Sequence, residues 1–189
     1  MLITFSSTQT KFIVLLLGSL ACSCSANSDG GSKSAGRGGD PLGLERVMIG
    51  SVYGVGSRFE SDGLQFAVEA LGDVEGNVQI GPAQGQASPG AKSLQLSHAT
   101  LRCQGRSASF LAFDFIDGGG QVSLEIEGER RSAADLIALD GAKLGGALVA
   151  VSESNTAGVR RGHVSLSGTI DRFAIGGTEL VLLDLRISQ

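Results

Sequence analysis

The side chains that could carry out acid–base or metal chemistry are few and widely spaced. The chain has two histidines, His98 and His163, and neither has a second histidine or a cysteine close by in the sequence. A zinc site needs several converging nitrogen, sulfur or oxygen ligands. The spacing of these residues therefore predicts no metal site and no cofactor.

The two histidines have different surroundings. His98 follows Leu94 and Leu96 at intervals of two, so we expect it to face the core of a strand. His163 follows Arg160 and Arg161 and forms a basic corner with them. The simplest interpretation of this corner is a solvated turn, and the alternative is a docking point for an anionic group. His98, Arg160, Arg161 and His163 are the candidate binding residues.

Catalytic residues are not identified by any motif. The pattern Gly-x-Ser-x-Gly and a glycine-rich phosphate loop are both absent from the sequence. Carboxylates recur in or near expected strands, and an acid and base pair would require two of them to meet within about 5–10 Å. They are Asp114, Glu125, Glu127 and Asp184. The sequence does not bring any two of them together, so the catalytic residues stay unknown.

Strands are the elements that must position these side chains. Apolar and polar residues alternate in four windows, 64–70, 93–97, 121–126 and 164–170, as expected of strands with one dry and one wet face. Such sheets are usually antiparallel. Two runs, 110–116 and 180–185, are apolar on both faces and are typical of central strands. The apolar side chains on their second face, such as Leu180, Leu182 or Phe110, could form a patch for a partner.

Turn residues separate these windows. They include 61–63, 75–77, 117–120, 140–141 and 176–177, all of which contain glycine. The spacing predicts an all-β fold of eight to ten strands, an antiparallel β-sandwich with a β-barrel as the alternative. At most one short helix is expected, near 132–140, where Ser132 could cap its start.

Composition narrows the class of protein. The formal net charge is −4, so nucleic acid is an unsuitable partner. Only Cys103 lies beyond the first two dozen residues, and we expect it to be a partly buried thiol in a strand. A disulfide from Cys103 to Cys24 is the alternative.

The N-terminus has the layout of a secretory signal. Lys11 is followed by an apolar segment, 12–21, which is about half as long as a membrane-spanning helix at ~1.5 Å per residue. Residues 18–22, Gly-Ser-Leu-Ala-Cys, resemble the lipobox of bacterial lipoproteins. The resemblance implies cleavage before Cys22 and attachment of lipid to its sulfur, with Cys24 as the alternative. Ser19 or Ala21 stands where leucine is commonest in that family.

A polar segment follows the two cysteines. Residues 22–44 are rich in glycine and serine and would form a flexible tether, with a root-mean-square span of roughly 25 Å. The expected organisation is a signal peptide over 1–21, a tether over 22–44 and one all-β domain over 45–189. The resemblance implies an extracytoplasmic protein anchored in the cell envelope, in the outer membrane if the host has one. A freely secreted protein is the alternative.

Three functions are compatible with these features. The first is a non-catalytic binding or structural role, in which the domain engages an envelope protein or another envelope component. The second is a lipocalin-like carrier of a small hydrophobic ligand, and the third is an envelope hydrolase with an unidentified site. The membrane is the expected partner in all three, through the N-terminal lipid.

Overall fold

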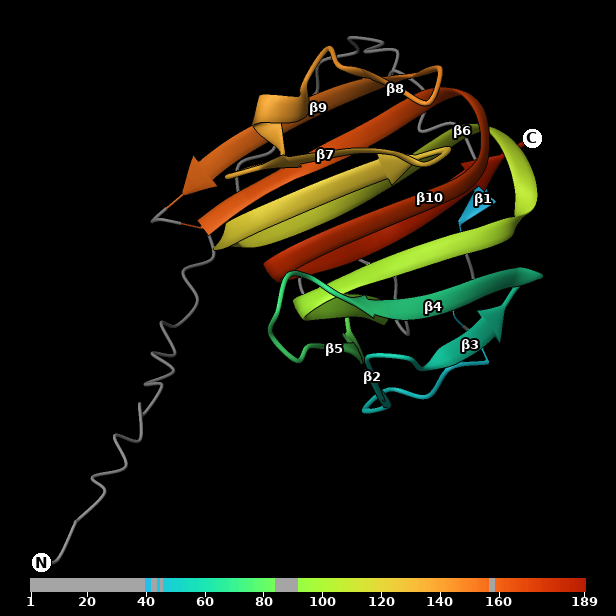
Figure 1. Cartoon of the computed structure of the whole chain (residues 1–189), viewed down its shortest axis with the longest axis vertical. Coiled ribbons are helices and arrows are strands. Elements are labelled where there is room, and N and C mark those ends of the chain that lie inside the picture. The colour runs from blue at the N-terminus through green and yellow to red at the C-terminus, as the bar shows by residue number, and fades with distance from the viewer. Residues whose placement is uncertain (1–39, 42–43, 45, 84–91, 157–158) are drawn as a thin grey trace, which may run out of the picture. The chain divides into compact units, whose positions relative to one another are not determined.

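The computed structural model describes residues 40–41, 44, 46–83, 92–156 and 159–189, and all of them lie in one unit, Gly36–Gln189. Strands make up almost all of it (Figure 1). The elements are β1 (Asp40–Pro41), β2 (Val52–Gly54), β3 (Arg58–Ser61), β4 (Leu64–Ala70), β5 (Asn77–Pro82), β6 (Lys92–Ile126), β7 (Glu129–Ala133), the 3-10 turn η1 (Ile137–Leu139), β8 (Lys143–Leu144), β9 (Ala147–Thr156) and β10 (Val159–Ser188). The named strands form one sheet of ten strands, and their pairings are antiparallel. The predicted all-β antiparallel fold is confirmed.

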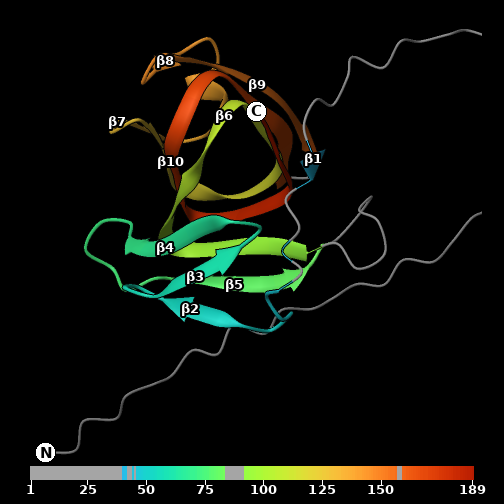
Figure 2. The same cartoon turned by 90° about the vertical axis from the view of Figure 1, so that its right-hand side faces the viewer.

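Two long strands, β6 and β10, organise this sheet. The second half of β10, residues 172–188, lies between two stretches of β6: it pairs with residues 94–104 along one side and with 110–126 along the other. The first half of β10, residues 160–170, pairs with residues 108–117 of β6. One continuous sheet therefore winds around its own core, as the ring of β6, β9 and β10 in Figure 2 shows.

The shorter strands extend the two long ones. β4 and β5 pair with the first half of β6, β3 pairs with β4, and β2 pairs with β5. β7 pairs with the end of β6, and β9 pairs with the first half of β10. The apolar run 110–116 is flanked by strands on both sides over most of its length, and the run 180–185 is flanked in this way over 180–182, which confirms that both are central over that part.

Alternation decides which side chains enter the core. In β4, Leu64, Phe66 and Val68 are buried, whereas Gln65 is exposed and Glu69 is only partly buried. The hairpin before β4 turns at Asp62 and Gly63, with φ of 51° and 74°. A two-residue turn with both φ values positive matches the twist of the paired strands. The glycine-containing turn predicted at 61–63 is confirmed.

His98 departs from the alternation that the sequence predicts. Its φ is 48°, and its carbonyl accepts a hydrogen bond from the Leu71 amide at 3.1 Å instead of continuing a regular ladder. The buried positions of β6 consequently change from Leu96 to Ala99, an interval of three. The expectation of a core-facing His98 is wrong, because this bulge shifts the pleat by one residue just before the histidine and leaves it partly exposed.

Asp184 causes the same shift in β10. Its φ is 46°, and the buried positions change there from Leu182 to Leu185. Leu180 and Leu182 are 1% and 2% exposed, so the patch expected from them does not exist; Phe110 is partly buried. These leucines face the core because the sheet winds around them.

Two glycine-rich segments predicted as turns lie inside strands instead. Residues 117–120 are part of β6 and residues 176–177 are part of β10. Gly176 lies where three strands are close together: a Cβ atom there would be 2.5 Å from Thr100 Oγ1 and 2.7 Å from Ser123 Oγ. The glycine permits this close contact rather than a reversal of the chain.

The short helical element is smaller than the sequence predicts. Only Ile137–Leu139 is helical, as a single 3-10 turn. Ser132 belongs to β7 and caps nothing, and Asp135 instead accepts a hydrogen bond from the Ala138 amide at 3.1 Å.

The described chain begins inside the segment predicted to be a tether. Asp40 in β1 pairs with Ile187 in β10, and Leu44 and Val47 are buried in the core. The Lys92 ammonium donates hydrogen bonds to the carbonyls of Leu44 at 2.7 Å and Val47 at 2.6 Å. The fold therefore already holds the chain at Asp40, Leu44 and Val47, before or close to the expected start of the domain.

Candidate functional site

A concave polar surface lies on the outward side of β3, β4 and the first half of β6. Strand register forms two rows there. Arg58, Ala67 and Arg102 make one row, and Glu60, Gln65 and Gln104 make the other. All of these residues face outward because their neighbours in sequence on β4 and β6, Phe66 and Cys103 among them, are buried.

The two rows line a groove with a volume of about 440 Å³. Ala67 lies between Arg58 and Arg102, and its short side chain leaves the space that the longer neighbours surround. The lining residues are Arg58, Phe59, Glu60, Gln65, Phe66, Ala67, Glu69, Arg102 and Gln104. This volume falls within the usual range for small-molecule sites, roughly 300–1,000 Å³.

An ion-pair network fixes one wall of the groove. Arg102 Nε is 2.7 Å from Glu69 Oε1, and Arg102 Nη1 is 2.7 Å from Glu125 Oε1. Arg130 on β7 donates to Glu125 from Nε at 2.8 Å. The Arg102–Glu125 contact passes over Ala174, whose small side chain lies between the two strands. The network therefore ties β4, β6 and β7 together.

The ion pairs of this network shift the pKa values of Glu125 and Arg102. The hydrogen bond from Arg102 is the main cause that lowers the pKa of the Glu125 carboxyl, and Arg130 adds to it against the effect of burial. The bonds to Glu69 and Glu125 raise the pKa of Arg102 above its ordinary value. Two carboxylates already engage the Arg102 guanidinium, so Arg102 is a fixed wall rather than a free ligand-binding group.

Four groove side chains are free to bind. In the part of the chain that the structure describes, Arg58, Glu60, Gln65 and Gln104 are exposed and make no side-chain hydrogen bond or ion pair. They offer a cation, an anion and two amides, which both donate and accept hydrogen bonds. Gln65 and Gln104 lie directly opposite each other. This arrangement can bind a polar ligand, and it contains no nucleophile with an adjacent base.

His163 does meet a strand carboxylate, on a different part of the sheet. Its Nδ1 is 2.7 Å from Asp114 Oδ1, and both side chains are about one-third exposed, at 38% and 32%. Ser152 on β9 lies opposite His163 in the register, so the three residues form a row across β6, β10 and β9. A catalytic triad also needs a bond between serine and histidine, and none joins this described pair.

Arg160 lies on the opposite side of β10 from His163. Its guanidinium contacts Asp117 Oδ2 and Asp135 Oδ2, each at 3.1 Å, so two carboxylates already engage it. Glu153 is nearby, and its Oε2 is buried without a hydrogen-bond partner among the described residues. Burial raises the pKa of the Glu153 carboxyl; the Arg160 charge opposes this shift, and Asp135 and Asp117 reinforce it.

The four candidate binding residues therefore do not form one site. Arg161 is exposed on the same side as His163, Arg160 faces inward, and His98 lies in the bulge of β6. Cys22, Cys24, the signal segment and most of the expected tether lie outside the described residues. Within the described ranges, no group of three His, Cys, Asp or Glu side chains is close enough to hold a metal ion.

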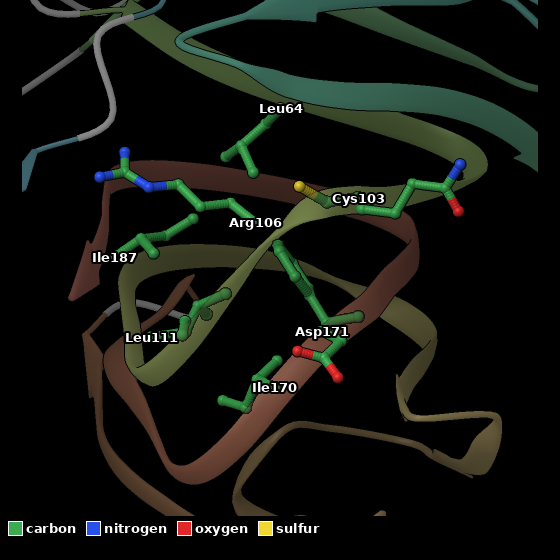
Figure 3. Close-up of a pocket in the computed structure, with 10 residues that line it drawn as sticks. Leu64, Cys103, Arg106, Leu111, Ile170, Asp171 and Ile187 are labelled. Atoms are coloured by element: carbon green, nitrogen blue, oxygen red, sulfur yellow. The ribbon is translucent and has the colours of Figure 1, made fainter. Parts of the chain in front are cut away.

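A pocket beside Cys103 reaches the core, and it is very small. It lies beside Cys103, Leu64, Leu111 and Ile170, with Asp171 at its rim (Figure 3). Its volume is about 10 Å³, roughly that of one water-sized probe. A hydrophobic ligand does not fit in it, so this pocket gives no support to the carrier alternative.

Cys103 is a buried free thiol, as expected, and burial raises its pKa to about 12.

The described residues form no helix that is long and apolar enough to cross a membrane.

Comparisons with protein-family models, with curated proteins and with solved structures return no match to this chain. The candidate site therefore depends on its own geometry.

Sequence reasoning missed the groove and its network. Glu125 was recognised as a strand carboxylate, but its partners Arg102 and Arg130 lie on other stretches of the sheet. A usable signal was present: Gln65, Ala67 and Glu69 form the polar side of an alternating strand, with a small residue between two long ones.

Proposed function

We propose that the protein is a lipid-anchored envelope protein whose β-domain binds a polar envelope component without transforming it. The groove of about 440 Å³ with four unengaged polar side chains is the observation that carries the binding part of this proposal. The lipobox-like sequence that ends at Cys22 supports the anchor, with Cys24 as the alternative position. An extracytoplasmic location follows, on the outer membrane if the host has one.

The anchor has a direct test. Intact mass spectrometry of the protein extracted from membranes is expected to give a chain that starts at Cys22, or at Cys24, with acyl groups attached. A mass that begins at Met1, or at a residue after a signal cut with no added acyl mass, would contradict the anchor.

The chemistry of the groove favours a ligand that is rich in amides and carries both charges. Gln65 and Gln104 can each pair with an amide through one donor and one acceptor. Arg58 suits a carboxylate and Glu60 suits an ammonium group. The charged lining side chains are Arg58 and Arg102 against Glu60 and Glu69, so the groove has no net charge that would select an ion of one sign. Peptide-bearing cell-wall polymer has this chemistry.

Co-sedimentation with purified cell-wall sacculi tests the groove. The double variant Gln65→Ala/Gln104→Ala is expected to lose most of the binding that the wild-type chain shows. The matched control is Gln79→Ala/Gln121→Ala, which removes two exposed glutamines outside the groove and should leave binding unchanged. Equal binding by the two variants, or no binding by wild type, would count against the groove as the site.

A second function, hydrolysis of an ester or amide in the envelope, is favoured by one observation. Asp114, His163 and Ser152 form a row in which the carboxylate already orients the imidazole. In such a row His163 would accept the Ser152 proton as the oxygen attacks a carbonyl carbon, and it would pass that proton to the alcohol or amine that leaves when its bond to this carbon breaks. Water, deprotonated by His163, would then attack the acyl-serine, release the carboxylic acid and return the proton to Ser152. Turnover of an activated ester that His163→Ala and Ser152→Ala both abolish would establish this function; turnover that neither variant alters would exclude these residues.

A further inference from the structure

Exposed apolar side chains gather at the start of the domain. Eight large apolar side chains are exposed among the described residues, and four of them lie within residues 48–55. They are Met48, Ile49, Val52 and Val55, and their exposed fractions are 76%, 52%, 59% and 47%. We refer to these four residues as the apolar edge. The other four exposed residues, Val74, Ile137, Leu148 and Val159, are scattered over other elements.

The apolar edge is held in place by the fold. It includes residues before, in and after β2, which lies at the end of the sheet and pairs with β5 (Figure 1). The Gly50 amide donates to the Ile80 carbonyl at 2.8 Å, which fixes the segment between Ile49 and Val52. Tyr53 stacks on Phe59 at 4.4 Å between ring centroids. Val52 therefore lies in an edge strand, and Met48, Ile49 and Val55 lie in the segments directly before and after it.

The apolar edge begins directly after the residues that attach the N-terminal segment to the fold. Lys92 bonds the carbonyls of Leu44 and Val47, and Met48 is the next residue. Residues 1–39 precede the described chain and include Cys22. A lipid on Cys22 would keep this end of the domain close to the bilayer, which raises the local concentration of lipid at the apolar edge.

The charges around the edge also suit a lipid surface. Residues 48–56 contain no charged side chain, and the exposed Arg46 stands just before them, while Arg58 after them belongs to the groove. The stretch from Arg46 to Phe59 contains no carboxylate, and Glu45 and Glu60 lie just beyond its two ends. An uncharged apolar segment beside a cation is typical of segments that enter the headgroup region, because the cation meets a lipid phosphate while the aliphatic groups enter the acyl boundary.

We propose that the apolar edge is a second membrane contact, which enters the surface of the bilayer that carries the N-terminal lipid. The inference rests on the lipid anchor of the proposed function and deepens it: the acyl chains hold the protein on the membrane, and the apolar edge seats the domain against it. Shallow burial of aliphatic side chains adds to the attachment that the acyl chains give, because membrane binding grows with the apolar area that is buried.

The absence of tryptophan from the chain makes a direct test available. Val52→Trp places one fluorophore in the apolar edge, Ile49→Trp is a second reporter, and Leu148→Trp is a matched exposed control on β9. Each full-length acylated protein is incorporated into phosphatidylethanolamine and phosphatidylglycerol vesicles whose acyl chains carry bromine. The tryptophans at 49 and 52 are expected to shift to the blue and lose most of their emission, while the one at 148 does neither.

Other results have defined meanings. Emission from residues 49 and 52 that matches the control at 148 overturns the proposal. A shift that depends on protein concentration without vesicles identifies a second copy of the chain as the occupant, and it also overturns the proposal. Intact mass of the same samples tests the anchor separately. If no acyl group is present, the anchor is wrong, and excess brominated vesicles added to the free chain decide the apolar edge alone: quenching supports it and unchanged emission overturns it.

Discussion

Replacement of Arg102 by methionine tests whether the wall of the groove also stabilises the fold. The substitution removes a guanidinium that bonds Glu69 and Glu125 and keeps a side chain of similar length over Ala174. The substitution breaks the Arg102–Glu125 contact but does not leave Glu125 unpaired, because Arg130 still bonds it at 2.8 Å. The variant therefore measures one interaction within a network that survives in part.

The expected loss follows from the exposure of each partner. Glu125 is 12% exposed, and a hydrogen bond to such a buried charge contributes about 1.5–3 kcal/mol. Glu69 is 40% exposed, and a pair near the surface adds only about 0.2–1 kcal/mol. Because Arg130 remains, we expect a decrease in the free energy of unfolding of about 2 kcal/mol at pH 7. This corresponds to a decrease in Tm of roughly 6 °C for a chain of this size.

The loss depends on pH with a defined sign. The pKa of Glu125 is lowered in the folded state, so the stabilisation from its charge is present above the ordinary glutamate pKa and disappears as pH falls through the lowered value. Arg102 stays protonated throughout. The difference between wild type and Arg102→Met should therefore shrink from pH 7 towards pH 3.

Urea unfolding followed by far-ultraviolet circular dichroism at pH 7 and pH 3 measures both quantities. Arg131→Met is the matched control, because Arg131 is exposed on β7 and makes no ion pair among the described residues. Its effect should stay within about 0.5 kcal/mol. A loss for Arg102→Met that equals the control at pH 7, or that is the same at both pH values, would refute the reasoning.

Three further predictions follow from single sites. Burial raises the pKa of Glu153, so ionisation of this carboxyl opposes folding as pH rises through the raised value. In thermal melts, Glu153→Gln should therefore increase Tm by a few degrees at pH 7 and have little effect at pH 3. Gly176→Ala should lower the free energy of unfolding in urea by about 1–3 kcal/mol, because the added methyl group would overlap Thr100 and Ser123. Gly54→Ala is the control and should cost much less, because a methyl group there meets no atom within 4 Å. Equal losses would contradict this packing. With its pKa raised to about 12, Cys103 should react with a disulfide reagent at pH 8 only after denaturation, as measured by peptide mass mapping. Rapid labelling of the native chain would contradict this prediction, because it would show that the thiol is accessible.

Local patterns in the sequence were enough to establish the fold class. Alternation in β4, with Leu64, Phe66 and Val68 buried, depends only on the two-residue repeat of a strand. The turn at Asp62 and Gly63 depends only on residues that tolerate a positive φ. Both features are properties of a few neighbouring residues, and for that reason they can be predicted without knowledge of the rest of the chain.

The site was decided by tertiary structure. Glu125 meets Arg102 only because the second half of β10 separates two stretches of β6 and places Ala174 between them. Gly176, predicted as part of a turn, became a point of close contact in the same crossing. A bulge at His98 then reversed which side of β6 faces the core. Pairing partners and bulges depend on packing and hydrogen bonding across the whole sheet. The sequence by itself therefore determined the strands of this protein, while the winding of β6 and β10 determined the groove.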